Sequence, residues 1–316
     1  MKRLKLVLHV GLVIGLVVAA TKYLNGGEVW SAIHRFRWEL TPVILAGTLL
    51  YFGLKAARFA YLVRRVEPVS PTLLVVAYLA GQAYTALPAG AAARSGLLKQ
   101  AGVPIAGTAP AVLVGSAGDG VALFTCSLLS ALWFPAFRGT ALWVLGGLVL
   151  VCTLLGVEAV RSWLADLAAN VADRFNVRER WEHFVEALQQ SIAPKPLLVS
   201  LGNGFISVGI LIVVLHFSVH GVGGDVPELT LLLAVALPSM LARLSAVPAG
   251  IGVTEAGMVA ILDGAPGITL PTAAAAVTIF RVGTIVFEIA LGVAIYFLLW
   301  RPLCRRELHQ NRARAT

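Results

Sequence analysis

The most constraining feature of the sequence is a series of apolar stretches, each long enough to reach across a lipid bilayer. Residues 68–93, for example, contain no charged side chain, and the whole chain is 58% hydrophobic and 13% charged, with a mean hydropathy of +0.85. Because a bilayer offers no water to unpaired amides, such stretches must form helices or be enclosed by protein. We therefore expect an all-α polytopic membrane protein, with a single transmembrane domain over residues 1–316.

The sequence predicts about eight membrane segments in total. Full spans are expected at residues 4–24, 40–63, 108–133, 140–157, 197–217 and 271–300. Two further segments, residues 72–99 and 229–262, are interrupted by Pro-Ala-Gly and could either cross the membrane or return to their own side as re-entrant hairpins. Residues 159–195 have the mixed charge and helical spacing of an amphipathic surface helix. Residues 301–316 form a basic tail.

The distribution of basic residues chooses between these two topologies, since cytoplasmic loops are enriched in Lys and Arg. Eight full spans place 11 basic residues on one side and 10 on the other. Six full spans and two re-entrant hairpins place 15 on the side of the termini against four, and leave six within the membrane. We expect this second topology, with both termini cytoplasmic. Of the six, Lys55 and Arg58 are expected to snorkel toward the cytoplasmic end of their span.

The two hairpins would enter the membrane from opposite sides, as inverted repeats do in transporters. In the second hairpin, Thr254 or Glu255 is expected to cap the short helix that follows the break. The backbone residues expected to break the helices are Pro88, Gly90, Pro248, Gly250 and Gly252. Because irregular backbone at membrane depth must be buried in protein or line a wet cavity, the hairpins predict a polar cavity.

Seven ionisable residues in or beside the apolar segments are expected to face this cavity, because a charge facing lipid costs at least about 2.5 kcal/mol. They are Arg94, Lys99, Asp119, Arg243, Glu255, Arg281 and Glu288. On the last helix, Arg281 and Glu288 share one face with Thr284 between them. Two interpretations stay open. These residues form internal salt bridges, such as Glu255 with Arg281, or their cations accept an anionic group near the half-helix N-termini.

Other classes of site are not indicated by the sequence. The net charge of +9 fits cytoplasmic loops and lipid headgroups better than nucleic acid. The three cysteines form no CxxC pair, and His216 and His220, four residues apart, have no third metal ligand nearby. No nucleophile motif or phosphate-binding loop is present. We expect neither a cofactor nor a metal ion.

The second hairpin resembles a known family. Residues 248–256, Pro-Ala-Gly-Ile-Gly-Val-Thr-Glu-Ala, resemble the Pro-Gly-Gly-x-Gly-x-x-Glu motif of the lysylphosphatidylglycerol synthase transmembrane, or flippase-like, family. Residues 88–104 are similar to its earlier segment, and Asp119 and Arg281 fall where an Asp and an Arg are usual. The resemblance covers nearly the whole chain, but the Gly-Glu of the family's first motif is replaced by alanines at residues 91–93.

In that family, fused members join this membrane domain to a soluble transferase that makes lysyl-phosphatidylglycerol, and the membrane part moves the lipid. The 316 residues contain no such transferase, so the resemblance implies the translocation half. We expect a flippase or scramblase of the bacterial inner membrane, not an enzyme. Its partner would be an anionic or aminoacylated phospholipid, or a polyprenyl- or hopanoid-type lipid, and a homodimer is left open.

The same resemblance suggests roles for individual residues. Arg94 and Arg281 would contact phosphate, while Glu255 and Asp119 would position those arginines or a cationic headgroup. Two alternatives remain. One is a membrane-embedded lipid-modifying enzyme with Glu255 as general base, and the other is a non-transporting partner of a lipid or glycan synthase.

Overall fold

The structure is a computed structural model, and over the residues that it describes the chain is helical, without strands. Those residues are 26–84, 93–156, 186, 188–245 and 250–305. Four helical segments among them are long and apolar enough to cross a membrane: Trp38–Val63, Ile105–Trp133, Pro194–Gly221 and Leu270–Arg305. The polytopic helical class is thus confirmed, whereas the count of six full spans stays a prediction. The predicted first span, residues 4–24, is outside the described residues.

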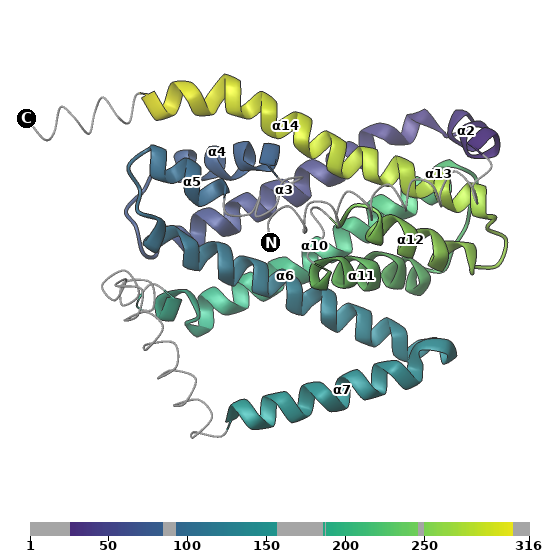
Figure 1. Cartoon of the computed structure of the whole chain (residues 1–316). Coiled ribbons are helices and arrows are strands. Elements are labelled where there is room, and N and C mark those ends of the chain that lie inside the picture. Colours follow the sequence, from purple (N-terminus) through teal and green to yellow (C-terminus); the bar gives the residue numbers. More distant parts are fainter. Residues whose placement is uncertain (1–25, 85–92, 157–185, 187, 246–249, 306–316) are drawn as a thin grey trace, which may run out of the picture.

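The four long segments make up most of the bundle, and the last of them runs along its upper edge in Figure 1. Three of them contain α3 (Thr41–Val63), α6 (Ile105–Trp133) and α10 (Pro194–Gly221), and α10 packs against both of the others. The last consists of α13 (Leu270–Arg281), a π-helical turn η5 (Val282–Val286), α14 (Phe287–Ile295) and a second π-helical turn η6 (Tyr296–Trp300). This segment continues to Arg305, five residues beyond the predicted end of the span.

Helices α6 and α10 approach each other closely because small residues face each other where they cross. A Cβ atom on Gly204 would lie 2.7 Å from the carbonyl oxygen of Gly118, and one on Gly118 would lie 2.4 Å from Ser200 Oγ. Ser200 Oγ donates a hydrogen bond to the carbonyl of Val114 at 3.0 Å, and Asn203 Nδ2 donates to a carbonyl of α3. Such small-residue contacts and interhelical hydrogen bonds are typical of helix packing in membranes.

The two interrupted segments each contain a pair of short helices that pack against each other. The first comprises α4 (Pro71–Gly81), the short turn η2 (Gln82–Tyr84) and α5 (Ala93–Gln100); the second comprises α11 (Glu228–Leu244) and α12 (Val253–Asp263). With 11 and eight residues, α4 and α5 are about 16 and 12 Å long, well short of the ~30 Å hydrocarbon core. The predicted breaks at Pro88, Gly90 and Pro248 lie outside the described residues.

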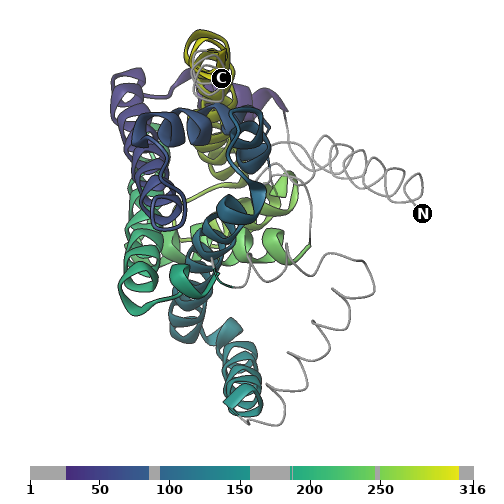
Figure 2. The ribbon, with the colours of Figure 1, turned by 90° about the vertical axis from the view of Figure 1, so that its left-hand side faces the viewer.

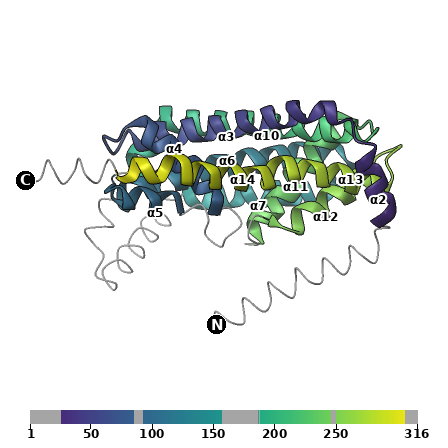
Figure 3. The same ribbon diagram turned by 90° about the horizontal axis from the view of Figure 1, so that it is seen from above.

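Each helix pair has its own hydrophobic core. The first core joins α4 and α5 to the end of α3 and of the last helix, through Leu62, Leu74, Leu98 and Trp300. The second joins α11 and α12 to α10 and α13. In Figure 1 the pair α4–α5 lies toward the end of the bundle that contains the C-terminal part of the last helix, and α12 lies toward the other end, beside α13. Figure 3 shows α3 and α10 together along one side of the bundle.

The remaining described helices lie at the periphery. Helix α2 (Gly26–His34) contacts α13, and the short helix η1 (Trp38–Leu40) leads into α3. Helix α7 (Pro135–Gly156) packs mainly against α6 and stands away from the bundle in the end-on view of Figure 2. Of the predicted amphipathic segment, residues 159–195, only 186 and 188–195 are described, so this prediction is not tested.

Candidate functional site

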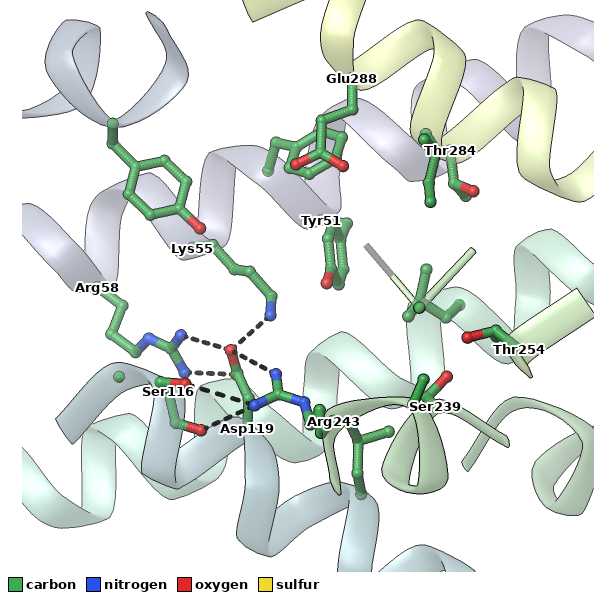
Figure 4. Close-up of a pocket in the computed structure, with 18 of the residues that line it drawn as sticks. Tyr51, Lys55, Arg58, Ser116, Asp119, Ser239, Arg243, Thr254, Thr284 and Glu288 are labelled. Carbon is green, nitrogen blue, oxygen red and sulfur yellow. Dashed lines mark hydrogen bonds and ion pairs between the residues drawn. The ribbon is translucent and has the colours of Figure 1, made fainter. Parts of the chain in front are cut away.

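A cavity of about 390 Å³ lies between the two helix pairs and is lined by α3, α6 and the last helix as well as by both pairs (Figure 4). Of the six basic residues that the predicted topology leaves within the membrane, five line this cavity: Lys55, Arg58, Arg94, Arg243 and Arg281. Two acidic residues, Asp119 and Glu288, line it too. The cavity therefore gathers nearly all of the charge that the apolar segments carry.

The buried carboxylate of Asp119, on α6, is the centre of an ionic cluster. Lys55 Nζ donates to Asp119 Oδ2 at 2.7 Å, and the guanidinium of Arg58 donates to both carboxylate oxygens, at 2.8 and 3.0 Å. Arg58 also reaches the carbonyl of Ser200 at 3.3 Å, and Lys55 Nζ lies 4.6 Å from the centre of the Tyr51 ring. Both oxygens of Asp119 are thus engaged by cations from α3.

The predicted snorkelling of Lys55 and Arg58 is wrong. Both side chains are nearly inaccessible, with exposed fractions of 8% and 6%, and point from α3 to α6 rather than toward the helix end. Residues three apart share a helix face, so both can reach one acceptor. Gly115, one turn before Asp119, leaves room for them: a Cβ there would lie 3.4 Å from Arg58 Nη2. The ion pairs that Lys55 and Arg58 form with buried Asp119 are thus favoured over solvation of the two side chains at the membrane interface.

Arg243 approaches the same cluster from the second helix pair, but it is held more loosely. Its Nη2 lies 3.9 Å from Asp119 Oδ2, and Nη1 contacts the carbonyl and hydroxyl oxygens of Ser116 at 3.3 and 3.4 Å, near the long limit for hydrogen bonds. Its side chain is 38% exposed, whereas that of Asp119 is 10% exposed. Arg243 thus links α11 to α6 through long contacts (Figure 4).

Arg94 enters the cavity from the first helix pair. Its Nη2 donates to Gln82 Oε1 at 3.0 Å, and its guanidinium lies 4.0 Å from the centre of the Tyr78 ring, a cation–π distance. Gly81 makes this position accessible, because a Cβ there would lie 2.7 Å from Arg94 Cγ. Among the described residues, the buried Nε of Arg94 has no hydrogen-bond partner. Arg94 is therefore positioned by the hairpin yet retains unused donors.

Glu255 and Arg281 form the internal salt bridge that was one of the two sequence interpretations. Arg281 Nε donates to Glu255 Oε1 at 2.5 Å, and the backbone amide of Gly252 donates to Glu255 Oε2, also at 2.5 Å. Each carboxylate oxygen thus has a partner. The carboxylate of Glu255 therefore fastens the start of α12 to the end of α13.

The helix start after the second break confirms one of the two predicted caps. The helix begins at Val253 with Gly252 at the N-cap position, and the side chain of Glu255 caps it by accepting a hydrogen bond from the Gly252 amide, whereas Thr254 does not act as the cap. Gly250 and Gly252 have φ values of +65° and +88°, in the region that favours glycine. A Cβ on Gly250 would also lie 2.6 Å from the Cβ of Ala242. The two glycines thus turn the chain so that Glu255 can reach back to an exposed amide.

The last helix brings Arg281, Thr284 and Glu288 to the cavity, as their common face predicts. Glu288 is 9% exposed. A π-helical turn, Val282–Val286, lies between Arg281 and Glu288, which the spacing alone does not reveal. Such turns inside α-helices are frequent at functional sites.

Two of the seven predicted residues do not line the cavity. Glu255 adjoins it through Arg281. Lys99 is exposed at the end of α5, while Leu97 and Leu98 beside it are buried in the first core. Conversely, the sequence interpretation missed Lys55, Arg58 and Tyr51 as cavity residues. The sequence pattern that could have indicated them is a pair of cations three residues apart inside an apolar span, with a tyrosine one turn earlier.

Comparison with known families supports the resemblance seen in the sequence. The sequence model of the family described as "Lysylphosphatidylglycerol synthase TM region" matches residues 6–292. The chain belongs to this family. Among curated proteins, none matches the chain. Together with the four apolar helices, membership identifies the chain as a multi-pass membrane protein of a lipid-related family.

Proposed function

We propose that this protein is a lipid flippase or scramblase whose cavity receives a phospholipid headgroup while the acyl chains stay in the bilayer. The observation that carries the proposal is the convergence of Lys55, Arg58, Arg94, Arg243 and Arg281 on one cavity between two helix pairs. Cations are costly in hydrocarbon, so five of them around a cavity favour an anionic guest. Arginine suits phosphate in particular because its planar fork can donate two parallel hydrogen bonds.

The proposal includes the re-entrant topology expected from the sequence. The α4–α5 helices are too short to span the bilayer, and the two pairs sit in separate cores. Basic residues support the orientation: Arg64, Lys195 and Arg305 occur at helix ends near the first pair, whereas the other end carries Arg37 and Arg138 with acids such as Glu228. Both termini would then be cytoplasmic. The order span, helix pair, span occurs in both halves, as an inverted repeat requires.

Movement of the two hairpins would open the cavity alternately to each leaflet. The last helix contacts both hairpins, through the Arg281–Glu255 bridge and through Gly292, where a Cβ would lie 2.4 Å from the amide nitrogen of Ala83. It could therefore couple their movements. The long contacts of Arg243 are the ones most easily broken when α11 moves. The sequence contains no nucleotide-binding motif, so movement would be downhill or coupled to an ion.

An enzymatic role for Glu255 is less well supported. A general base must reach the proton that it removes, but Glu255 does not line the cavity, and its two oxygens are held by Arg281 and the Gly252 amide. Within the described residues, no cluster of three His, Cys, Asp or Glu side chains could hold a metal ion. These contacts favour a structural role for Glu255 and a transport role for the cavity.

Reconstitution tests the proposed function. Purified protein is incorporated into vesicles that carry a trace of acyl-labelled phospholipid, and the outer-leaflet label is destroyed chemically. We expect protein-containing vesicles to lose more than half of the label, because inner-leaflet lipid reaches the surface, while the mass of each lipid is unchanged. Equal loss in protein-free vesicles across anionic, zwitterionic and cationic phospholipids would contradict the flippase function. A change in lipid mass would indicate an enzyme instead.

A further inference from the structure

The charges around the cavity distinguish between anionic and aminoacylated headgroups. Among the described residues, five cations and two acids line it, and Glu255 adjoins it through Arg281, which leaves an excess of two positive charges. The undescribed hairpin segments, residues 85–92 and 246–249, contain no ionisable side chain and so do not alter this balance. A guest with negative charge would be attracted, and one with an added ammonium group would be repelled.

Two of the five cations, Arg94 and Arg243, have no ion pair shorter than 3.9 Å among the described residues. Lys55 and Arg58 pair with Asp119, and Arg281 pairs with Glu255, at 2.5–2.8 Å. Arg94, by contrast, has a buried Nε without a partner among the described residues, and Arg243 makes only long contacts. One of these arginines belongs to each helix pair. This differs from the sequence expectation, in which Arg94 and Arg281 contact phosphate.

The volume of the cavity suits a lipid headgroup. It is about 390 Å³, within the range of ~300–1,000 Å³ that is usual for ligand pockets. A phosphate esterified to a small polyol fits this space. A lysyl ester on that polyol would bring positive charge next to Arg94 and Arg243. Charge rather than size therefore disfavours an aminoacylated headgroup.

We propose that the cavity selects a net-anionic phosphate headgroup, such as phosphoglycerol, which Arg94 and Arg243 bind from the two opposing hairpins, and that it rejects aminoacylated headgroups. This inference rests on the proposed flippase function and names its substrate class. Arg94 would receive the phosphate when the first hairpin is open, and Arg243 when the second is open. The Asp119 and Glu255 bridges would keep the other three cations in place throughout.

The test compares lipids in vesicles that contain the full-length chain. Acyl-labelled phosphatidylglycerol, phosphatidylethanolamine and lysyl-phosphatidylglycerol are used in parallel, at equal protein density. We expect phosphatidylglycerol to exchange at least about tenfold faster than the lysyl form, since like charges in a poorly solvated site repel strongly. Equal or faster exchange of the lysyl form would overturn the selectivity but leave the flippase function intact. Failure of all three lipids to exchange would instead contradict the flippase function itself.

Variants test the two arginines. Arg94→Gln and Arg243→Gln should each slow phosphatidylglycerol exchange by about tenfold, because each removes a charged fork from the phosphate. Lys99→Gln is a matched control, since it removes one positive charge from the same helix as Arg94 but at an exposed position. Wild-type rates in folded Arg94→Gln and Arg243→Gln proteins, or an equal loss in Lys99→Gln, would overturn the assignment. If a variant does not fold, the comparison of lipids in the wild-type protein still decides the selectivity.

A second measurement distinguishes a lipid headgroup from a free anion. Vesicles are loaded with radiolabelled glycerol phosphate, and its release is followed while phosphatidylglycerol exchanges. Retention of the label during exchange is expected if phosphate enters only as part of a lipid. Release that depends on the protein and on Arg243 would show that the same arginines carry free glycerol phosphate, and would overturn selection of a lipid.

Discussion

Replacement of Asp119 by asparagine should be among the most destabilising single changes in this protein. Asp119 is the only acid within ion-pairing distance of Lys55 and Arg58 among the described residues. In Asp119→Asn both cations would stay buried, with exposed fractions of 8% and 6%, and Arg58 would keep only neutral acceptors, the new amide oxygen and the Ser200 carbonyl at 3.3 Å. Removal of one member of a buried ion pair costs about 3–5 kcal/mol. We expect a loss in that range.

The assay is reversible unfolding of the purified protein in mixed micelles, followed by circular dichroism as the fraction of denaturing detergent rises. Asp263→Asn is the matched control, because Asp263 is an exposed acid at the end of α12 and should change stability by no more than about 0.5 kcal/mol. Lys55→Met should cost less than Asp119→Asn, since Arg58 would still bind both oxygens of the acid. If Asp119→Asn is no less stable than Asp263→Asn, the ionic cluster does not hold α3 to α6.

Three further predictions concern packing, the second hairpin and topology. Gly204→Val should destabilise the protein by about 1–3 kcal/mol, because α6 leaves no room for a Cβ at this position. Gly209→Val on the same helix faces open space and should leave the stability unchanged. Equal stability of the two variants would refute the close crossing of α6 and α10. Glu255→Gln should cost about 1.5–3 kcal/mol through loss of a charged hydrogen bond to Arg281, and Glu228→Gln at a 72% exposed position should be neutral in the same unfolding assay. Single cysteines at Val177 and Thr316 of a cysteine-free variant should react with an impermeant reagent from the same side of the membrane, because two full spans separate them in the re-entrant topology and three in the topology of eight full spans; reaction from opposite sides would contradict the re-entrant topology.

Much of the fold follows from the sequence, because apolar length and helix-breaking residues act locally. The limits of α3, α6 and α10 lie within a few residues of the predicted spans, and Pro-Ala-Gly separates the expected pairs of short helices. The Glu255–Arg281 bridge was one of the two interpretations that the sequence left open, since each residue is an isolated charge near an apolar segment. In these cases the residue type and its apolar neighbours in the sequence are enough to predict the local structure.

The wrong predictions concern side chains whose position depends on which helices pack against each other. Lys55 and Arg58 could reach either the interface or a partner, and only the crossing of α3 with α6 places Asp119 within 3 Å of both. Lys99 has the same sequence setting as Arg94, but five residues along α5 it faces away from the cavity. Of the two predicted caps, Glu255 rather than Thr254 accepts the Gly252 amide, and the sequence did not decide between them.

The most direct measurement is the rate of phosphatidylglycerol exchange in vesicles that contain the Arg94→Gln/Arg243→Gln double variant, compared with wild type at equal protein density. Both arginines line the cavity and neither belongs to the short bridges at Asp119 and Glu255, so the double variant should fold. Correct folding is checked by its helical circular dichroism and its unfolding midpoint. We expect rapid exchange in wild type and the rate of protein-free vesicles in the folded double variant. Exchange as fast as wild type would show that lipid does not pass through this cavity.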